Sequence, residues 1–259
     1  MGRVIAIANQ KGGVGKTTTA VNLSASISLA EEEILLIDSD PQGNATSGYE
    51  AGRTQGQANL YDVYAGRCTI EQAIIKTAVN HLSLIPSSVD LLGVEIEIVD
   101  KQGRETLLSQ MISSIRDRFR YIFIDCPPSL GLLTLNAMVA ADSVLVPVQC
   151  EYYALEGLGM LTKTLSLVRK SFNPSLYIEG LLLTMYDGRN LLSSQVEEEL
   201  RKHFGKKVYN TVIPRNVTLA EAPSHGKPVL LYDARSRGAQ SYITLAKEIL
   251  NENGIRQRA

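Results

Sequence analysis

Two lysines and a cluster of glycines stand close together near the start of the chain, in the run ANQKGGVGKTTTA. Gly15, Lys16 and Thr17 match the end of the phosphate-loop pattern G-x-x-x-x-G-K-[ST], whose backbone N–H groups surround phosphate oxygens ahead of a helix. Gln10 replaces the first glycine of that pattern, and a second lysine, Lys11, stands beside it. The run therefore predicts a nucleotide-phosphate site with one cation more than the pattern requires.

The segments around this loop have the character that a phosphate site needs. The apolar run RVIAIA precedes it as a predicted strand, and a helix is predicted at 17–30. The helix N-terminus adds N–H donors and the positive end of a dipole. Lys16 is expected to reach the β- and γ-phosphates and the Thr17 hydroxyl to bind Mg²⁺. The alternative is a Gly-rich turn with two solvated lysines, which this context disfavours. The predicted nucleotide contacts here are Lys11, Gly12, Gly13, Val14, Gly15, Lys16, Thr17 and Thr18.

Aspartates follow two of the predicted strands. In LLIDSDPQGNAT, Asp38 ends an apolar run and Asp40 follows in a turn. Asp40 can orient or deprotonate the attacking water and is also placed at the metal, whereas Asp38 can support the loop or the metal through water. YIFID ends at Asp125 in a Walker B pattern, whose aspartate holds Mg²⁺, usually through water. The alternative, that the aspartates only form turns, is disfavoured after a phosphate loop. The expected chemistry is direct attack of water on the γ-phosphate.

Short apolar runs alternate with helical stretches along the whole chain. This alternation predicts an α/β fold with a doubly wound, mostly parallel sheet flanked by helices, as a single domain over 1–259. We expect residues 49–70 to form an irregular surface excursion. The predicted strands are 3–8, 33–38, 81–86, 121–125, 143–148 and 177–185, and the predicted helices are 17–30, 104–118, 131–141, 154–170, 190–204 and near 237–252.

Composition limits the classes of function. The net charge of −1 provides no global basic field, so contact with nucleic acid or membrane must come from a local patch. The three cysteines show no C-x-x-C spacing, which indicates a reducing compartment. No secretory signal and no apolar run of the ~20 residues that span a bilayer is visible. These features predict a cytoplasmic protein.

The motifs together carry a family resemblance. KGGVGKTT resembles the deviant Walker A loop of the ParA/MinD class of P-loop NTPases, and DSDPQGN and DCPPSLG resemble its two switch segments. The resemblance implies a Mg²⁺-dependent ATPase that is weak alone and stimulated by a partner. It also implies an ATP-sandwich homodimer, in which Lys11 contacts the nucleotide of the second copy. Asp40 takes the role of the switch aspartate that hydrolysis needs, and Cys126 stands where Ala is common.

The C-terminal third is similar to the ParA/Soj chromosome-partition ATPases, in EYYALEGLGML, LLTMYDGRN and TVIPRNVTLAEAPSHGKP. That similarity implies that Pro214 and Asn216, with Met185 nearby, hold the adenine. It implies that the ATP dimer binds double-stranded DNA non-specifically, is nucleoid-associated and responds to a ParB/Spo0J-type protein. Thr218 stands where relatives often have Arg, so one expected DNA contact is weakened and DNA binding depends more on Arg189. The predicted DNA-binding residues are Arg189, Lys202, Arg215, Lys227 and Arg235.

Three other functions remain as alternatives. A MinD-like membrane switch needs a C-terminal amphipathic helix, but the tail AKEILNENGIRQRA has few apolar residues and Gly254 is expected to end the helix. Stable membrane association is therefore not expected. A relative of the nitrogenase iron protein would need paired cluster cysteines, and Cys126 and Cys150 lack the expected flanks. A scaffold without enzymatic turnover is disfavoured by Asp40. Whether the cargo is a chromosome or a plasmid is left open.

Overall fold

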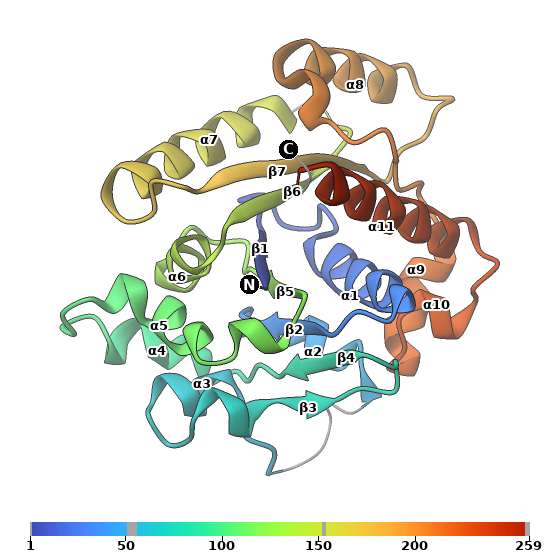
Figure 1. Ribbon diagram of the computed structural model, residues 1–259. Coiled ribbons are helices and arrows are strands. Elements are labelled where there is room, and N and C mark those ends of the chain that lie inside the picture. Colours follow the sequence, from blue (N-terminus) through green and yellow to red (C-terminus); the bar gives the residue numbers. More distant parts are fainter. Residues whose placement is uncertain (1, 51–55, 152–153, 257–259) are drawn as a thin grey trace.

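A seven-stranded sheet forms the centre of the computed structural model, which describes residues 2–50, 56–151 and 154–256 (Figure 1). The strand order is β3-β4-β2-β5-β1-β6-β7. All neighbouring strands run parallel except β3 and β4, which are antiparallel. The predicted doubly wound, mostly parallel sheet is thus confirmed. The strands are β1 (Arg3–Ile7), β2 (Ile34–Asp38), β3 (Ile75–Lys76), β4 (Leu82–Ile85), β5 (Tyr121–Asp125), β6 (Ser143–Gln149) and β7 (Tyr177–Thr184).

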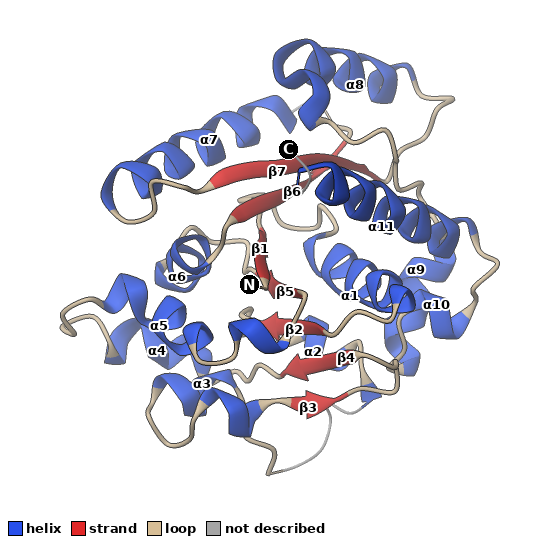
Figure 2. Ribbon diagram, in the orientation of Figure 1, coloured by secondary structure: helices blue, strands red, loops and turns tan. Residues whose placement is uncertain are grey.

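Helices cover both faces of this sheet (Figure 2). One face carries α1 (Lys16–Ile27), α2 (Asn44–Ser47), α9 (Val217–Glu221), α10 (Val229–Tyr232) and α11 (Arg237–Arg256). The other carries α3 (Leu60–Tyr64), α4 (Leu91–Glu97), α5 (Leu107–Ser113), α6 (Leu132–Ala140), α7 (Ala154–Ser171) and, beside the β7 edge, α8 (Leu191–Phe204). Short 3₁₀ turns are Ser28–Ala30, Ile70–Ala73, Arg104–Thr106, Arg116–Arg118, Gly205–Lys207 and Ala222–His225.

The central strands are apolar throughout because both of their faces are covered. Every residue of β2 and β5 is buried. Alternate side chains enter two separate cores, with Leu36 and Phe123 on the α1 and α11 side and Leu35 and Ile122 on the other. Uniform burial explains why these strands read as continuous Ile, Val and Leu runs instead of alternating with polar residues.

Some expected elements differ in the structure. Residues 104–118 form a broken unit, with a 3₁₀ turn on each side of α5. The described part of 49–70 is not a surface excursion, since α3 buries Leu60, Val63 and Tyr64 against the sheet and begins at an Asn59 capping box. Residues 51–55 lie outside the described ranges. The expected helix end at Gly254 is wrong because α11 continues to Arg256; glycine lowers helix propensity without forcing an end.

Candidate nucleotide site

The phosphate loop lies where strand β1 turns into helix α1. Gly13 and Gly15 have φ values of 74° and 87°, in the left-handed region that favours glycine. Gly15 is the residue before α1, whose first turn has neither an acidic residue nor a side-chain cap. The N–H groups at this end of α1 are therefore available to an anion.

Lys16 points across this loop toward the acidic strand ends. Its Nζ donates to the Lys11 carbonyl over 3.1 Å, and only 6% of the residue is exposed. Burial lowers the pKa of Lys16, while Asp125, Cys126 and Asp40 act in the opposite direction. A buried ammonium that donates to a backbone carbonyl in a phosphate loop is well placed to exchange that carbonyl for a phosphate oxygen.

Asp38 and Asp125 lie side by side at the carboxyl edge of the sheet, where the registers of β2 and β5 pair them. Both are fully buried. Asp38 accepts hydrogen bonds from Thr46 N and Oγ1, each over 2.7 Å, and from Asp40 N. Burial raises the pKa of Asp38 to about 6 despite these donors. Asp38 thus fixes the turn that carries Asp40.

Asp125 differs from Asp38 because neither of its oxygens has a hydrogen-bond partner in the described part of the chain. Burial and the neighbouring Asp38 raise the pKa of Asp125 well above its usual range, and the Thr17 side chain acts against this shift. A buried carboxylate without a donor, next to a hydroxyl and an open phosphate cavity, fits a hard cation. Among the described residues no group of three His, Cys, Asp or Glu side chains is arranged to hold a metal ion.

The switch aspartate opens onto the same cavity. Asp40 is 6% exposed, and its Oδ1 accepts a hydrogen bond from Gln42 N over 2.9 Å. It lines a cavity of about 300 Å³ together with the phosphate loop and Pro128. The fold therefore brings Lys16, Thr17 and Asp40 around one space, with Asp125 behind it.

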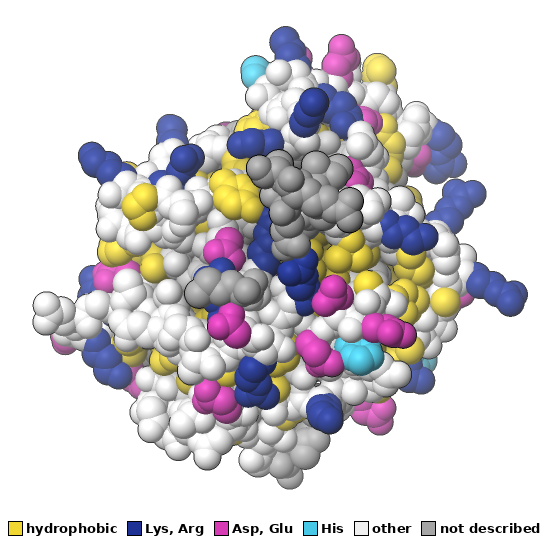
Figure 3. All heavy atoms as spheres, viewed as in Figure 1, with side chains coloured by type: hydrophobic (Ala, Val, Ile, Leu, Met, Phe, Trp, Pro, Cys, Tyr) yellow, Lys and Arg dark blue, Asp and Glu magenta, His cyan; other side chains and the backbone are white. Residues whose placement is uncertain are grey.

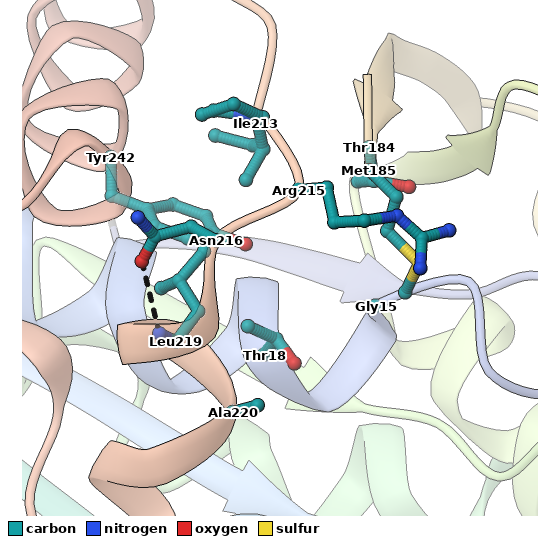
Figure 4. Close-up of a pocket in the computed structure, with 11 residues that line it drawn as sticks. Gly15, Thr18, Thr184, Met185, Ile213, Arg215, Asn216, Leu219, Ala220 and Tyr242 are labelled. Atoms are coloured by element: carbon teal, nitrogen blue, oxygen red, sulfur yellow. Dashed lines mark hydrogen bonds between the residues drawn. The ribbon is translucent and has the colours of Figure 1, made fainter. Parts of the chain in front are cut away.

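A second cavity, of about 260 Å³, is shown in Figure 4. Gly15, Thr18 and Met185 line both cavities. Pro214 and Asn216 line the second cavity, and their role toward the base stays a prediction; Asn216 Oδ1 also accepts from Leu219 N and so begins α9. Three apolar residues of this wall, Ile213, Leu219 and Tyr242, were not predicted from the sequence.

Met185 is the strained residue of this pocket. Its φ is 50°, unusual for a residue other than glycine. The strain lies at the end of β7, where Tyr186 pairs with Pro214 as an isolated parallel bridge. Sequence reasoning placed Met185 near the base from the family resemblance alone, and no local pattern signals the positive φ.

Lys11 lies on the outer lip of the loop. Its Nζ forms an ion pair with Glu151 over 2.5 Å, beyond the end of β6. The Lys11 side chain therefore lies outside the cavity that Lys16 enters. The role of Lys11 toward a second copy stays a prediction.

The five predicted DNA-binding residues are all exposed. Arg189 is 92% exposed and pairs with Asp187, and Lys202 pairs with Glu199 on α8. Arg215 differs from the others because it lines the second cavity beside Met185. Figure 3 shows dark-blue basic side chains around α8 at the top of the view, interleaved with acidic ones.

Comparison with known proteins decides the family. A family model described as an AAA domain matches residues 2–178. The sporulation initiation inhibitor protein Soj of Bacillus subtilis is 54% identical, over 96% of this chain and 98% of that protein. The chromosome partitioning protein ParA of Caulobacter vibrioides is 53% identical, over 98% of this chain and 96% of that protein. This chain belongs to the ParA/Soj family of P-loop ATPases. The expected family resemblance is confirmed.

A solved structure supports the assignment of an adenine nucleotide and Mg²⁺ to this ParA/Soj chain. The septum site-determining protein MinD of Pyrococcus horikoshii, complexed with Mg-ADP, matches with a TM-score of 0.79 and 28% identity, over 98% of each chain. The cofactor of this ATPase is Mg²⁺, and Thr17 and Asp125 offer the donors that would hold it. No helix in the described ranges is long and apolar enough to cross a membrane.

Proposed function

We propose that this chain is a DNA-partition ATPase that acts as an ATP-dependent dimer. In this proposal residues 1–259 form one domain, and two copies enclose two ATP molecules. Lys11 carries the proposal, because its ammonium lies on the outer lip of the phosphate loop while Lys16 occupies the inner position. A cation placed there can neutralise the phosphate charge of a nucleotide bound to a second copy. ATP presents more negative charge than ADP because it carries the γ-phosphate.

Hydrolysis would end the dimeric state. Asp40 orients or deprotonates the attacking water, Lys16 stabilises charge on the β- and γ-phosphates, and Thr17 with Asp125 would hold the metal. Met185, Pro214 and Asn216 hold the base. Cys126 takes no part, since it is fully buried and burial raises the pKa of its thiol.

DNA contact would come from a basic surface that a dimer presents twice. Arg189, Lys202, Lys227 and Arg235 are exposed and can meet phosphates without reading bases. Arg215 contributes less to this surface because it lines the base pocket. Binding of this kind places the protein on the nucleoid.

Release from DNA would depend on a ParB/Spo0J-type protein that stimulates weak hydrolysis. Identity of 54% to Soj against 28% to MinD favours this function over a membrane-positioning switch. The percentage of sequence identity does not distinguish a chromosome from a plasmid as the cargo.

The experiment that tests the proposal is binding of non-specific duplex DNA by the Asp40→Ala protein, measured with ATP, with ADP and without nucleotide at two salt concentrations. Removal of the switch carboxylate is expected to slow hydrolysis and hold the ATP dimer on DNA. Binding should appear only with ATP and weaken steeply with salt. Absence of binding in all three states would contradict the DNA function, and liposome flotation would then test the membrane alternative.

A further inference from the structure

The ion pair between Lys11 and Glu151 is anchored at both ends. On the lysine side, Lys11 N donates to Asn9 Oδ1 over 3.0 Å, and Asn9 Nδ2 donates to the Pro147 carbonyl over 2.7 Å. On the glutamate side, the second carboxylate oxygen accepts from Gln149 Nε2. Glu151 N also donates to the Gln149 carbonyl over 2.8 Å. The chain segments after β1 and β6 are thus joined at the position of the ion pair.

Lys11 is also tied to the phosphate site through its backbone. Its carbonyl is the acceptor for Lys16 Nζ, over 3.1 Å. A phosphate that recruits the Lys16 ammonium removes this bond. Lys11 is therefore held through its backbone N–H, its carbonyl and its ammonium, and the contact at the carbonyl would be lost when nucleotide binds.

We propose that Glu151 is a positioning residue that holds the Lys11 ammonium within its own copy and must release it before Lys11 contacts the nucleotide of a second copy. This inference rests on the proposed ATP dimer. Glu151 and the partner's nucleotide phosphates compete for one ammonium, so the pair opposes dimer formation until nucleotide is bound on both sides. Glu151 then sets the protein concentration at which the ATP-bound dimer forms.

The size of the effect follows from the exposure of the pair. The Lys11 and Glu151 side chains are 34% and 46% exposed, so solvent screens their attraction. A pair of this kind changes an equilibrium by up to about fivefold. A dimer must release two pairs, so loss of both is expected to tighten ATP-dependent dimerisation by up to about 25-fold.

The test is the dimer dissociation constant of the Glu151→Gln protein with a non-hydrolysable ATP analogue and Mg²⁺, measured by sedimentation. The amide keeps the shape of the side chain and removes the charge. The dissociation constant should fall by roughly 3- to 25-fold, while Glu151→Asp stays closer to wild type. Glu198→Gln, on exposed α8, is the matched control and should change nothing. An unchanged or raised dissociation constant for Glu151→Gln would overturn the inference.

Lys11 variants separate this inference from the proposed function. Lys11→Ala should lose the ATP dimer while its monomer still binds nucleotide. The double variant Lys11→Ala/Glu151→Gln should stay monomeric, whereas a role of Glu151 that is independent of the lysine would still shift it toward the dimer. If Lys11→Ala dimerises like wild type, the trans role of Lys11 is wrong. If Lys11→Ala loses the dimer but Glu151→Gln behaves like wild type, only the role of Glu151 is wrong.

Discussion

At the scale of single residues, three aspartates share one edge of the sheet and differ in their hydrogen bonds. Asp38 accepts three protein donors, Asp40 accepts from the Gln42 amide, and Asp125 accepts none among the described residues. Residue type and strand position alone do not distinguish them. The donors around each carboxylate indicate which one supports the loop, which one faces the phosphate cavity and which one suits a cation.

The buried Asp38 should give stability a measurable dependence on pH. Its pKa is raised from 3.8 to about 6, so the folded state binds the proton more tightly than the unfolded state does. Its contribution to the free energy of unfolding is therefore largest below pH 4 and falls as pH rises to about 6. Relative to Asp38→Asn, wild type should lose about 2 kcal/mol of unfolding free energy between pH 4.5 and 7.5. Urea unfolding of the nucleotide-free proteins between pH 4.5 and 7.5 measures the difference, and parallel pH curves would contradict it.

At the scale of elements, the cavity proposed for the base depends on the packing of α9 against α11. A Cβ added to Gly238 at the start of α11 would lie 2.5 Å from Leu219 Cγ, and Leu219 lines the pocket. Gly238 is therefore needed for the close approach of the two helices.

Gly238→Ala should accordingly disturb both stability and nucleotide binding. The clash is expected to cost about 1–3 kcal/mol of unfolding free energy and to displace Leu219, so that ADP affinity falls. Gly157→Ala is the matched control, because no atom lies within 4 Å of its added Cβ in α7; it should stabilise the protein by about 0.5–1 kcal/mol. Thermal unfolding and ADP titration of both variants provide the measurement. Normal affinity in Gly238→Ala would mean that α9 tolerates the displacement.

Elements that a local sequence pattern marks could be predicted from the sequence. Features that depend on contacts between distant segments could not. Strands such as β2 and β5 are buried on both faces, so burial is visible as a continuous apolar run. The phosphate loop is likewise a local pattern. The four-residue helices α2 and α10 carry too few residues to show a period. Tyr242 reaches the base pocket from α11, and no local signal connects it with the loop at Gly15.

At the scale of the whole molecule, the net charge of −1 means that the proposed DNA binding would depend on a few positions and not on a general field. Arg189 is the most exposed of the paired basic residues described above, and its partner Asp187 must be displaced or shared when phosphate binds. The pair lowers the pKa of Asp187 to about 2, so the carboxylate stays charged at neutral pH.

Arg189→Ala should therefore weaken DNA binding without preventing dimerisation. One phosphate contact is lost in each copy, so the slope of log K against log salt should become shallower by about 2. Binding of the ATP-bound protein to duplex DNA at several salt concentrations measures this slope, and sedimentation checks the dimer. Lys247→Ala, an exposed lysine on α11, serves as control. A uniform loss of affinity with an unchanged slope would place Arg189 away from the DNA.

The packing of α11 on α1 also affects the order of events during synthesis. Thr19 Oγ1 and Tyr242 Oη lie 3.2 Å apart in this contact, yet about 210 residues separate the two helices along the chain. A ribosome needs roughly 10–40 s to translate that length. During this interval the apolar side of α1 that packs on α11 stays uncovered. Nucleotide can bind in its final geometry only after α11 emerges.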